Sequence, residues 1–508
     1  MVGAVNIAFV PDMQRKLYRW SLVDPDKRFA DLFNLVCDQR TLDAAWRKLS
    51  RNQGSRTPGT DGVTRDRVEE RPGGAGRFLS EIREDLRHGT YQPQPVRQRL
   101  IPKPGKSGKM RPLGIPTLRD RLVQMALKLV LEPIFEADFY PTSYGFRPGR
   151  STHDALAVAQ CKLHPTRMGP SRFRFVIEGD IKGCFDAVDH HLLMERVRRR
   201  IKDRHVLRLI LAFLKAGIMI EGTVRHPQTG TPQGGIISPL LANVYLTAID
   251  ERYGRWSGRP REAAKTPLYR RYQDRKKGQP TFCSVRYADD FIVFVEGTWD
   301  EAQAERQALA EFLRRELRME LSMEKTKITT VEEGFIFLGY RVVQTKGVRS
   351  GNPVGNLFIP KSKLTDLRYK IKEQVRAMPT GEPLARIIGM LNPLIRGWRS
   401  YYRYATRASR DFTSLDWWMT QRVGRWLRKK HPKATWHELY RRFSRSPRGE
   451  RLRWSEGFAR LASFYEGGVK RYPNRGIRIP NGWNDEPGDR FQRGADQFWS
   501  SFYTLAER

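Results

Sequence analysis

The sequence predicts an α+β fold with helical segments on both sides of it, and three observations carry this prediction. Residues 1–99 have basic, helical patterns that Gly- and Pro-rich turns interrupt. Residues 100–345 alternate short apolar runs typical of strands with longer runs of helical spacing, a pattern shared by α/β and α+β proteins. Residues 361–445 are helical again. The 508 residues suffice for about three domains.

The charge of the chain points to a polyanionic partner. Its 93 Lys and Arg residues outnumber 55 Asp and Glu residues, which gives a net charge of +38. A charge of this size repels itself in the compact state unless an anion such as nucleic acid balances it. We find no apolar run of the roughly 18 residues that a membrane helix needs, and no signal-peptide pattern at the start. We therefore expect no membrane partner.

The cysteines exclude a structural zinc site. Cys37, Cys161, Cys184 and Cys283 lie far apart and form no C-x-x-C pair. Such a zinc site needs four nitrogen or sulfur ligands, usually in closely spaced pairs. We therefore expect four reduced, buried thiols.

Two helices of the central region have clear start signals. Ser238 followed by Pro239 predicts a cap and then a helix over 240–250. Thr298 with Glu301 three residues later predicts a capping box at the start of a second helix. The apolar stripe of this second helix consists of Leu309, Phe312, Leu313, Leu317 and Leu321.

The sharpest chemical signal is a pair of adjacent aspartates, Asp289 and Asp290. Apolar, β-prone residues flank the pair, so we expect it at the tip of a hairpin between two buried strands. Two carboxylates this close raise each other's pKa unless a cation lies between them. Taken alone, the segment is equally well explained as an ordinary turn on a surface hairpin.

A third aspartate favours the functional interpretation. Alternating apolar residues over 173–177 predict a strand that ends at Asp180. If this strand pairs beside the hairpin, Asp180 converges with Asp289 and Asp290. Three carboxylates on rigid strands would hold two divalent ions about 4 Å apart, with positions left open for phosphate oxygens and water. Such a site suits attack of a 3′-hydroxyl on a nucleoside triphosphate.

These residues belong to an ordered set of motifs that resembles the reverse transcriptase/maturase proteins encoded by bacterial group II introns. Eight blocks occur in the expected order, and two further stretches, around Gly59-Thr-Asp61-Gly and Gly397-Trp-x-x-Tyr-Tyr, extend the resemblance to both sides. The eight blocks are Leu100-Ile-Pro-Lys103-Pro-Gly, Arg111-Pro-Leu-Gly-Ile-Pro-Thr117, Ser143-Tyr-Gly-Phe-Arg147-Pro-Gly-Arg-Ser-Thr-His153, Asp180 to Asp186, Gly230-Thr-Pro-Gln233-Gly-Gly-Ile-Ile-Ser-Pro-Leu-Leu-Ala-Asn243, Arg286 to Phe291, Leu321-Ser-Met-Glu-Lys325-Thr-Lys and Phe337-Leu-Gly-Tyr340.

The resemblance implies a right-hand polymerase. It places fingers and palm over 100–345, an N-terminal extension and the start of the fingers over 1–99, and a helical thumb, or maturase, domain over 361–445. The remaining residues, 446–508, form a basic tail for which DNA binding is a candidate role.

The resemblance also implies the active-site residues. Asp180, Asp289 and Asp290 match the catalytic carboxylates, and the implied ligands of two Mg²⁺ ions are Asp180, Ile181 and Asp289. Phe185 matches the bulky residue that excludes the 2′-hydroxyl of a ribonucleotide; its alternative is an ordinary core aromatic. The other implied nucleotide-binding residues are Lys103, Arg111 and Gln233.

A basic, aromatic segment follows the predicted palm. Residues 361–453 contain 24 Lys and Arg against 7 Asp and Glu, together with many Trp and Tyr. The cations attract phosphates irrespective of base sequence, and aromatic rings offer faces for bases. A large part of the rings should instead form the core of a small helical domain. The expected RNA-binding residues are Arg422, Arg425, Arg428 and Lys429.

We therefore expect a bacterial, cytoplasmic RNA-directed DNA polymerase that also binds its intron RNA and aids splicing. Its expected partners are the RNA template, a DNA primer or target DNA, and dNTPs, and its oligomeric state is left open. The alternatives are an RNA-binding maturase with little polymerase activity, a reverse transcriptase of a defence or CRISPR system, and an RNA-dependent RNA polymerase, which Phe185 disfavours. Many relatives carry a metal-binding endonuclease domain, but no cysteine follows Cys283, so the resemblance does not extend to target-strand cutting.

Overall fold

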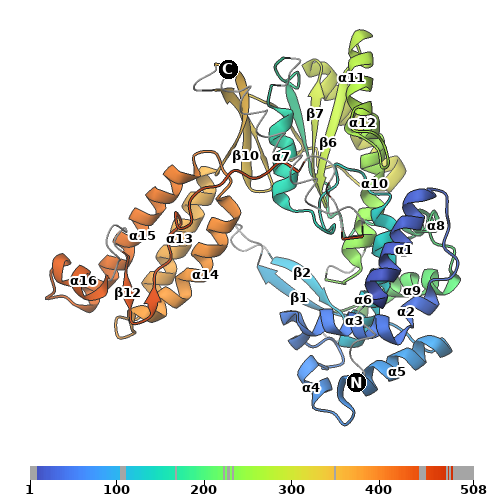
Figure 1. Ribbon diagram of the computed structural model, residues 1–508, viewed down its shortest axis with the longest axis horizontal. Coiled ribbons are helices and arrows are strands. Elements are labelled where there is room, and N and C mark those ends of the chain that lie inside the picture. The colour runs from blue at the N-terminus through green and yellow to red at the C-terminus, as the bar shows by residue number, and fades with distance from the viewer. Residues whose placement is uncertain are drawn as a thin grey trace. The chain divides into compact units, whose positions relative to one another are not determined.

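The computed structural model of the chain divides into two compact units (Figure 1). The first unit contains Met1–Val158, Arg172–Thr330 and Arg475–Phe498, and the second contains Ala159–Ser171, Val331–Asn474 and Trp499–Arg508. The structure describes residues 8–102, 110–165, 169–220, 223–225, 229–230, 234–347, 351–444, 453–475, 479 and 482–483.

The first unit begins with helices that surround one central helix. α6 (Leu118–Glu136) is buried along nearly its whole length, and α1 (Phe9–Val23), α2 (Phe33–Val36) and α3 (Gln39–Ser50) pack against it. The Thr117 side chain caps α6 by accepting a hydrogen bond from the Asp120 backbone N–H. The other N-terminal elements are η1 (Gln53–Arg56), α4 (Arg65–Glu69) and α5 (Gly74–His88).

Two four-stranded sheets follow in the same unit. In the first, β1 (Val96–Pro102) and β2 (Met110–Ile115) form an antiparallel hairpin, β4 (Ile218–Ile220) runs parallel to β1, and β5 (Thr223–Arg225) pairs with β4. The second, which we call the central sheet, has the order β6-β7-β3-β8 and is antiparallel throughout. Its strands are β3 (Phe175–Gly179), β6 (Thr281–Tyr287), β7 (Asp290–Glu296) and β8 (Lys327–Thr330).

Helices cover the central sheet, which is why β6 and β7 are buried almost throughout. α10 (Ser238–Ser257) packs against β6, and α12 (Trp299–Leu317) packs against β3. The apolar residues of the sheet and helices form one core with those of α6. The remaining helices of this part are α8 (His190–Arg198), α9 (Arg204–Lys215) and α11 (Thr266–Lys276), together with the first residues of α7 (Thr152–Lys162), whose last residues belong to the second unit. Helices and an antiparallel sheet in one core confirm the α+β prediction.

The predicted capping box is present, but the apolar stripe behind it ends early. Thr298 and Glu301 exchange the two expected hydrogen bonds at the start of α12. The helix stops at Leu317 because Arg318 adopts a left-handed conformation, with φ 48°. Leu321 is therefore buried outside the helix rather than in its stripe.

The predicted cap and bounds of α10 are wrong. The helix begins at Ser238 itself, no side chain caps it, and it runs to Ser257 rather than ending near residue 250. Most of its residues are buried, so packing on several sides extends the helix beyond the local signal.

The second unit combines a small sheet with a helical bundle. The antiparallel sheet contains β9 (Phe335–Phe337), β10 (Tyr340–Lys346) and β11 (Pro353–Phe358). Helices α13 and α14 pack against α15, and α16 follows it (orange in Figure 1). Tyr402 and Trp426 are buried in this bundle, whereas Trp417 is 68% exposed. The bounds are α13 (Lys361–Ala377), α14 (Leu384–Tyr402), α15 (Ala408–Lys430), α16 (Trp436–Phe443), β12 (Ser455–Glu456) and β13 (Ala459–Arg460).

The cysteines are free, as expected, and Cys37, Cys184 and Cys283 are buried. Burial raises the pKa of the Cys37, Cys161 and Cys184 thiols to about 12, so these stay protonated. Cys161 is only half-buried, against the expectation for all four. No helix in the described part of the chain has the length and apolar character that crossing a bilayer requires.

Candidate active site

Strand pairing brings the three predicted aspartates to one end of the central sheet. The register of β3 with β7 ends at the pair Gly179 and Phe291, so the next residue, Asp180, comes beside Asp290. A two-residue turn that contains Asp289 joins β6 to β7. The hairpin predicted from the sequence is therefore present, and Asp180 lies next to its tip.

The charges around these carboxylates compensate little of their negative charge. The pKa of Asp290 is raised to about 6, first because the surrounding protein withdraws water from the carboxyl group and then because Asp289 and Asp180 carry like charge. The Asp290 side chain still reaches solvent. The Lys325 ammonium lies 3.0 Å from Oδ2 of Asp180, but both side chains are open to water, and such pairs contribute only about 0–1 kcal/mol.

The donor chemistry of this site fits magnesium. Mg²⁺ prefers carboxylate and carbonyl oxygens and keeps several waters or substrate oxygens in its shell. Asp180 and Asp289 offer carboxylates, whereas Ile181 can offer only its backbone carbonyl because its side chain has no donor atom. Within the described ranges, no three His, Cys, Asp or Glu side chains are already arranged as a metal site. An ion here would therefore need substrate or water oxygens to complete its shell.

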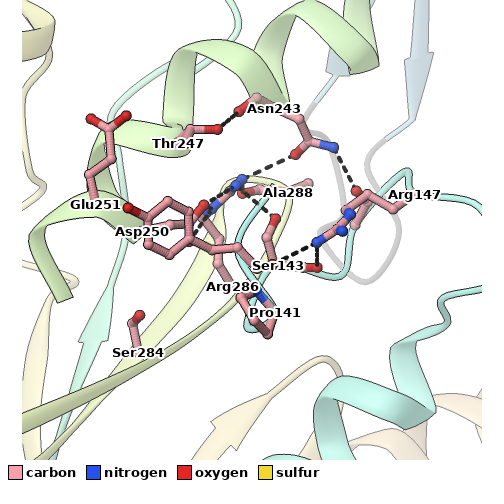
Figure 2. A network of polar contacts seen from close by, with 12 residues as sticks. Pro141, Ser143, Arg147, Asn243, Thr247, Asp250, Glu251, Ser284, Arg286 and Ala288 are labelled. Atoms are coloured by element: carbon pink, nitrogen blue, oxygen red, sulfur yellow. Dashed lines mark hydrogen bonds and ion pairs between the residues drawn. The ribbon is translucent and has the colours of Figure 1, made fainter. Parts of the chain in front are cut away.

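A buried arginine holds the turn beside Asp289 (Figure 2). Arg286 is fully buried and pairs with Asp250, with 2.5 Å between Nη2 and Oδ2. Its guanidinium also donates to Oδ1 of Asn243 at 3.1 Å, to Oγ of Ser143 at 2.7 Å and to the Ala288 carbonyl at 3.0 Å. One side chain thus ties the turn to α10 and to the segment that contains Ser143.

That segment, 140–147, packs directly against the turn. Arg147 forms a second buried ion pair, 2.7 Å from Glu136. A Cβ on Gly145 would lie only 2.3 Å from the Ala288 backbone nitrogen, so this position has no room for a side chain. The Asn243 side-chain amide donates to the Gly145 carbonyl at 2.7 Å. The motif over 143–147 therefore supports the turn rather than supplying a reacting group in the described structure.

Two described glycines approach other backbone segments closely, Gly230 beside the turn that contains Phe185 and Gly234 beside β2. Phe185 is half-buried in the turn after β3. A Cβ on Gly230 would lie 3.1 Å from the Asp186 carbonyl oxygen and 3.3 Å from that of Phe185. A Cβ on Gly234, whose φ is +126°, would lie 2.1 Å from the Gly114 carbonyl oxygen. The Gly234 position leaves no room for a Cβ, whereas at Gly230 the fit is tight and the left-handed φ of +100° is what favours glycine.

The remaining predicted nucleotide-binding residues differ in what the structure describes. Arg111 lies exposed at the start of β2, across the β1–β2 hairpin from Ile101. Lys103 and Gln233 lie outside the described residues.

The four predicted RNA-binding cations occupy the last turns of α15. Arg425, Arg428 and Lys429 are exposed, and Arg422 is half-buried. The Arg428 guanidinium lies 5.6 Å from the centre of the Trp436 ring, which orients it on the surface of the bundle.

Sequence reasoning gave no role to Lys325, Arg286 or Asp250. A signal existed for the last two, because an arginine in an otherwise apolar strand and an aspartate on a buried helix both need a partner. Their pairing could not be read from the sequence, since the two residues are 36 positions apart and meet only through the packing of α10 on β6.

The fold, with three aspartates at one end of the central sheet, is typical of one class of protein, the template-directed polymerases. A family profile for reverse transcriptase (RNA-dependent DNA polymerase) matches residues 101–342. A second profile, for the maturase-specific domain of group II introns, matches residues 364–444.

Relatives identify the family. The chain is 40% identical to protein YkfC of Escherichia coli K12 over 383 residues, which are 72% of this chain and 97% of YkfC. It is 37% identical to the group II intron-encoded protein LtrA of Lactococcus lactis over 356 residues, 62% of this chain and 57% of LtrA. An uncharacterized 91 kDa protein in a cob intron of Schizosaccharomyces pombe is 30% identical over 484 residues, 83% of this chain and 58% of that protein. The chain belongs to the group II intron-encoded reverse transcriptase/maturase family, although it spans little more than half the length of LtrA.

Proposed function

We propose that this protein is an RNA-directed DNA polymerase of a group II intron, with Asp180, Asp289 and Asp290 as its catalytic carboxylates. The observation that carries the proposal is the antiparallel pairing of β3 with β7, which brings Asp180 beside Asp290. This pairing lies within the segment that the reverse transcriptase profile matches. The intact set of three aspartates favours an active polymerase over a maturase that only binds RNA.

Asp180, Asp289 and the Ile181 carbonyl are the groups that would hold two Mg²⁺ ions. When bound, these ions would lower the pKa of a primer 3′-hydroxyl and neutralise charge on the departing pyrophosphate. The protein itself orients the carboxylates from strand ends and a short turn, so that their positions do not depend on a flexible loop. Lys325 offsets part of their charge at Asp180.

The nucleotide is selected and held by residues around this end of the sheet. Phe185 would lie under the incoming sugar and leave no space for a 2′-hydroxyl. Arg111 would bind the triphosphate, since a guanidinium can grip phosphate oxygens with two hydrogen bonds. Lys103 and Gln233 are proposed for the same pocket on the resemblance alone.

RNA binding belongs to the second unit in this proposal. The exposed cations of α15 would contact the intron RNA or the template, and the match to the maturase-specific domain supports intron RNA over a defence-system role. We assign 1–99 to the N-terminal extension, 100–345 to fingers and palm, 361–445 to the thumb, and 446–508 to a DNA-binding tail. A DNA primer or target DNA and dNTPs complete the proposed partners, and we propose a place in the bacterial cytoplasm, for which the bacterial sources of YkfC and LtrA are the support.

Primer extension on an RNA template tests the proposal. The double variant Asp289→Asn, Asp290→Asn should lose extension with dNTPs and Mg²⁺, because neutral amides bind the ions poorly, while RNA affinity stays near wild type. Asp300→Asn removes an exposed carboxylate from the first turn of α12 and should extend normally. Extension by the double variant at the wild-type rate would refute the active-site assignment.

A further inference from the structure

The conformation of the turn beside Asp289 depends on an unusual backbone angle. Ala288 has φ 59°, in the left-handed region that residues with a Cβ rarely adopt. Such conformations persist only where the surrounding structure holds them. Arg286 donates a hydrogen bond to the carbonyl of this same residue, at 3.0 Å. The contact therefore acts on the strained peptide itself.

Contacts outside the turn hold the Arg286 guanidinium in place. Its Nε lies 3.1 Å from each carboxylate oxygen of Asp250, and its Nη2 lies 2.5 Å from Oδ2. Ser143 and Asn243 accept two more of its hydrogen bonds. The planar guanidinium supplies all these donors in one rigid fork, which a lysine ammonium cannot do.

A contribution to stability alone explains this arrangement poorly. Burying two charges costs much of what their attraction returns, so apolar side chains of similar size would often serve stability as well. An apolar residue could not hold the Ala288 carbonyl. The buried pair Arg147 and Glu136 shows the contrast, because in the described part of the chain Arg147 donates to the carbonyls of Tyr140 and Ser143 rather than to the turn.

We propose that Arg286, held by Asp250, is a positioning residue that sets the left-handed conformation of Ala288 and thereby directs the Asp289 carboxylate toward Asp180. The proposal rests on the proposed function, since it takes Asp289 as a ligand of the catalytic metal. The residue acts through the turn and touches no substrate.

Arg286→Lys tests the proposal, with Mn²⁺ as the probe ion. Lysine keeps the charge opposite Asp250 but loses the fork, so Mn²⁺ binding, measured by the loss of the free ion's EPR signal, should weaken by about 10- to 100-fold, the range expected for one hydrogen bond to a charged group. The kcat of primer extension should fall by a similar factor while the KM for dNTP changes little.

Arg252→Lys is the matched control. Arg252 lies on the same helix as Asp250 and donates to the two carboxylate oxygens of Glu305, at 2.9 and 3.1 Å, rather than to the turn. This variant should bind Mn²⁺ like the wild type. Equal losses in the two lysine variants would show a general effect of breaking an ion pair and would overturn the proposal.

A second substitution tests whether Arg286 acts through residue 288. Glycine adopts a left-handed φ without the Cβ cost, so Ala288→Gly in the Arg286→Lys background should recover part of the lost Mn²⁺ affinity. No recovery would overturn the proposal. If Arg286→Lys does not fold, Asp250→Glu is the substitute, because it displaces the same guanidinium while keeping the negative charge. The Asp250→Glu variant should also bind Mn²⁺ more weakly than the wild type, and adding Ala288→Gly should recover part of that affinity.

The Asp289→Asn variant distinguishes a failure of the positioning proposal from a failure of the proposed function. If Asp289→Asn loses Mn²⁺ and Arg286→Lys keeps wild-type affinity and kcat, only the positioning proposal fails. If Asp289→Asn itself binds Mn²⁺ and extends primers normally, the proposed function fails with it.

Discussion

Phe185 is the residue through which sugar choice can be tested. The turn that carries it is packed against Gly230, since a Cβ there would lie 3.3 Å from the Phe185 carbonyl oxygen, and the ring itself is half-buried. Phe185→Ala should open space for a 2′-hydroxyl, and the ratio of dNTP to rNTP incorporation efficiency should fall by roughly 10- to 100-fold, the scale on which pockets discriminate small groups. Phe312→Ala, which removes a half-buried ring from α12, is the control. An unchanged ratio in Phe185→Ala would identify that ring as core packing.

Asp290 makes metal binding dependent on pH. Its pKa in the folded protein is about 6, above the ordinary value of 3.8. Without metal, the contribution of this group to stability is fully present below pH 3.8 and is lost as the pH rises through 6. An ion held by Asp180 and Asp289 is attracted by the neighbouring Asp290 carboxylate only when that group is ionised, so the trend for Mn²⁺ affinity is the reverse.

We therefore expect Mn²⁺ affinity to fall about tenfold between pH 7 and pH 5, because roughly a tenth of a group with this pKa is ionised one unit below it. Binding titrations followed by EPR measure this directly. Asp290→Asn should bind weakly and show a flat response over the same range. A flat response in the wild-type protein would contradict the placement of Asp290 beside the metal ligands.

At the scale of elements, α15 is the part whose role in RNA binding can be isolated. Its last turns carry Arg422, Arg425, Arg428 and Lys429, three of which are exposed. Replacing all four with Gln should flatten the dependence of log affinity for RNA on log salt by up to about one unit per lost phosphate contact. Extension of a saturated short primer–template should persist.

The control replaces four cations on and after α12, namely Arg306, Arg314, Arg315 and Arg318. It removes the same charge from a different helix and should change the slope less. An equal change of this slope in both variants would show that the effect depends on net charge rather than on α15. Loss of extension on saturated substrate in the α15 variant would instead place that helix in the catalytic fold.

The elements around the site were predictable where the signal was local. Apolar flanks predicted the hairpin that carries Asp289, and Thr298 with Glu301 predicted the start of α12. The full length of α10 was not predictable, because tertiary burial rather than a cap determines it. The φ of Ala288 was not predictable either, since it follows from contacts with Arg286 and Gly145 that come from distant parts of the chain.

At the scale of the whole molecule, the candidate active site and the most basic segment lie in different compact units. The aspartates lie in the first unit, and the segment 361–453, with 24 Lys and Arg against 7 Asp and Glu, lies in the second. Composition predicted a polyanionic partner, and the order of the motifs predicted the family, because both are properties of the sequence itself. The buried pair of Arg286 and Asp250 forms only in the folded chain, so no sequence motif indicated its role.

The most direct test of the central claim, that Asp180, Asp289 and Asp290 surround a divalent metal site, is iron-mediated cleavage of the chain. Fe²⁺ can take the place of Mg²⁺, and with peroxide and ascorbate it generates hydroxyl radicals that cut the backbone near the bound ion. We predict cuts near residues 180 and 289 that excess Mg²⁺ suppresses and that Asp180→Asn abolishes. An absence of cuts at these positions, or an unchanged pattern in Asp180→Asn, would contradict the claim.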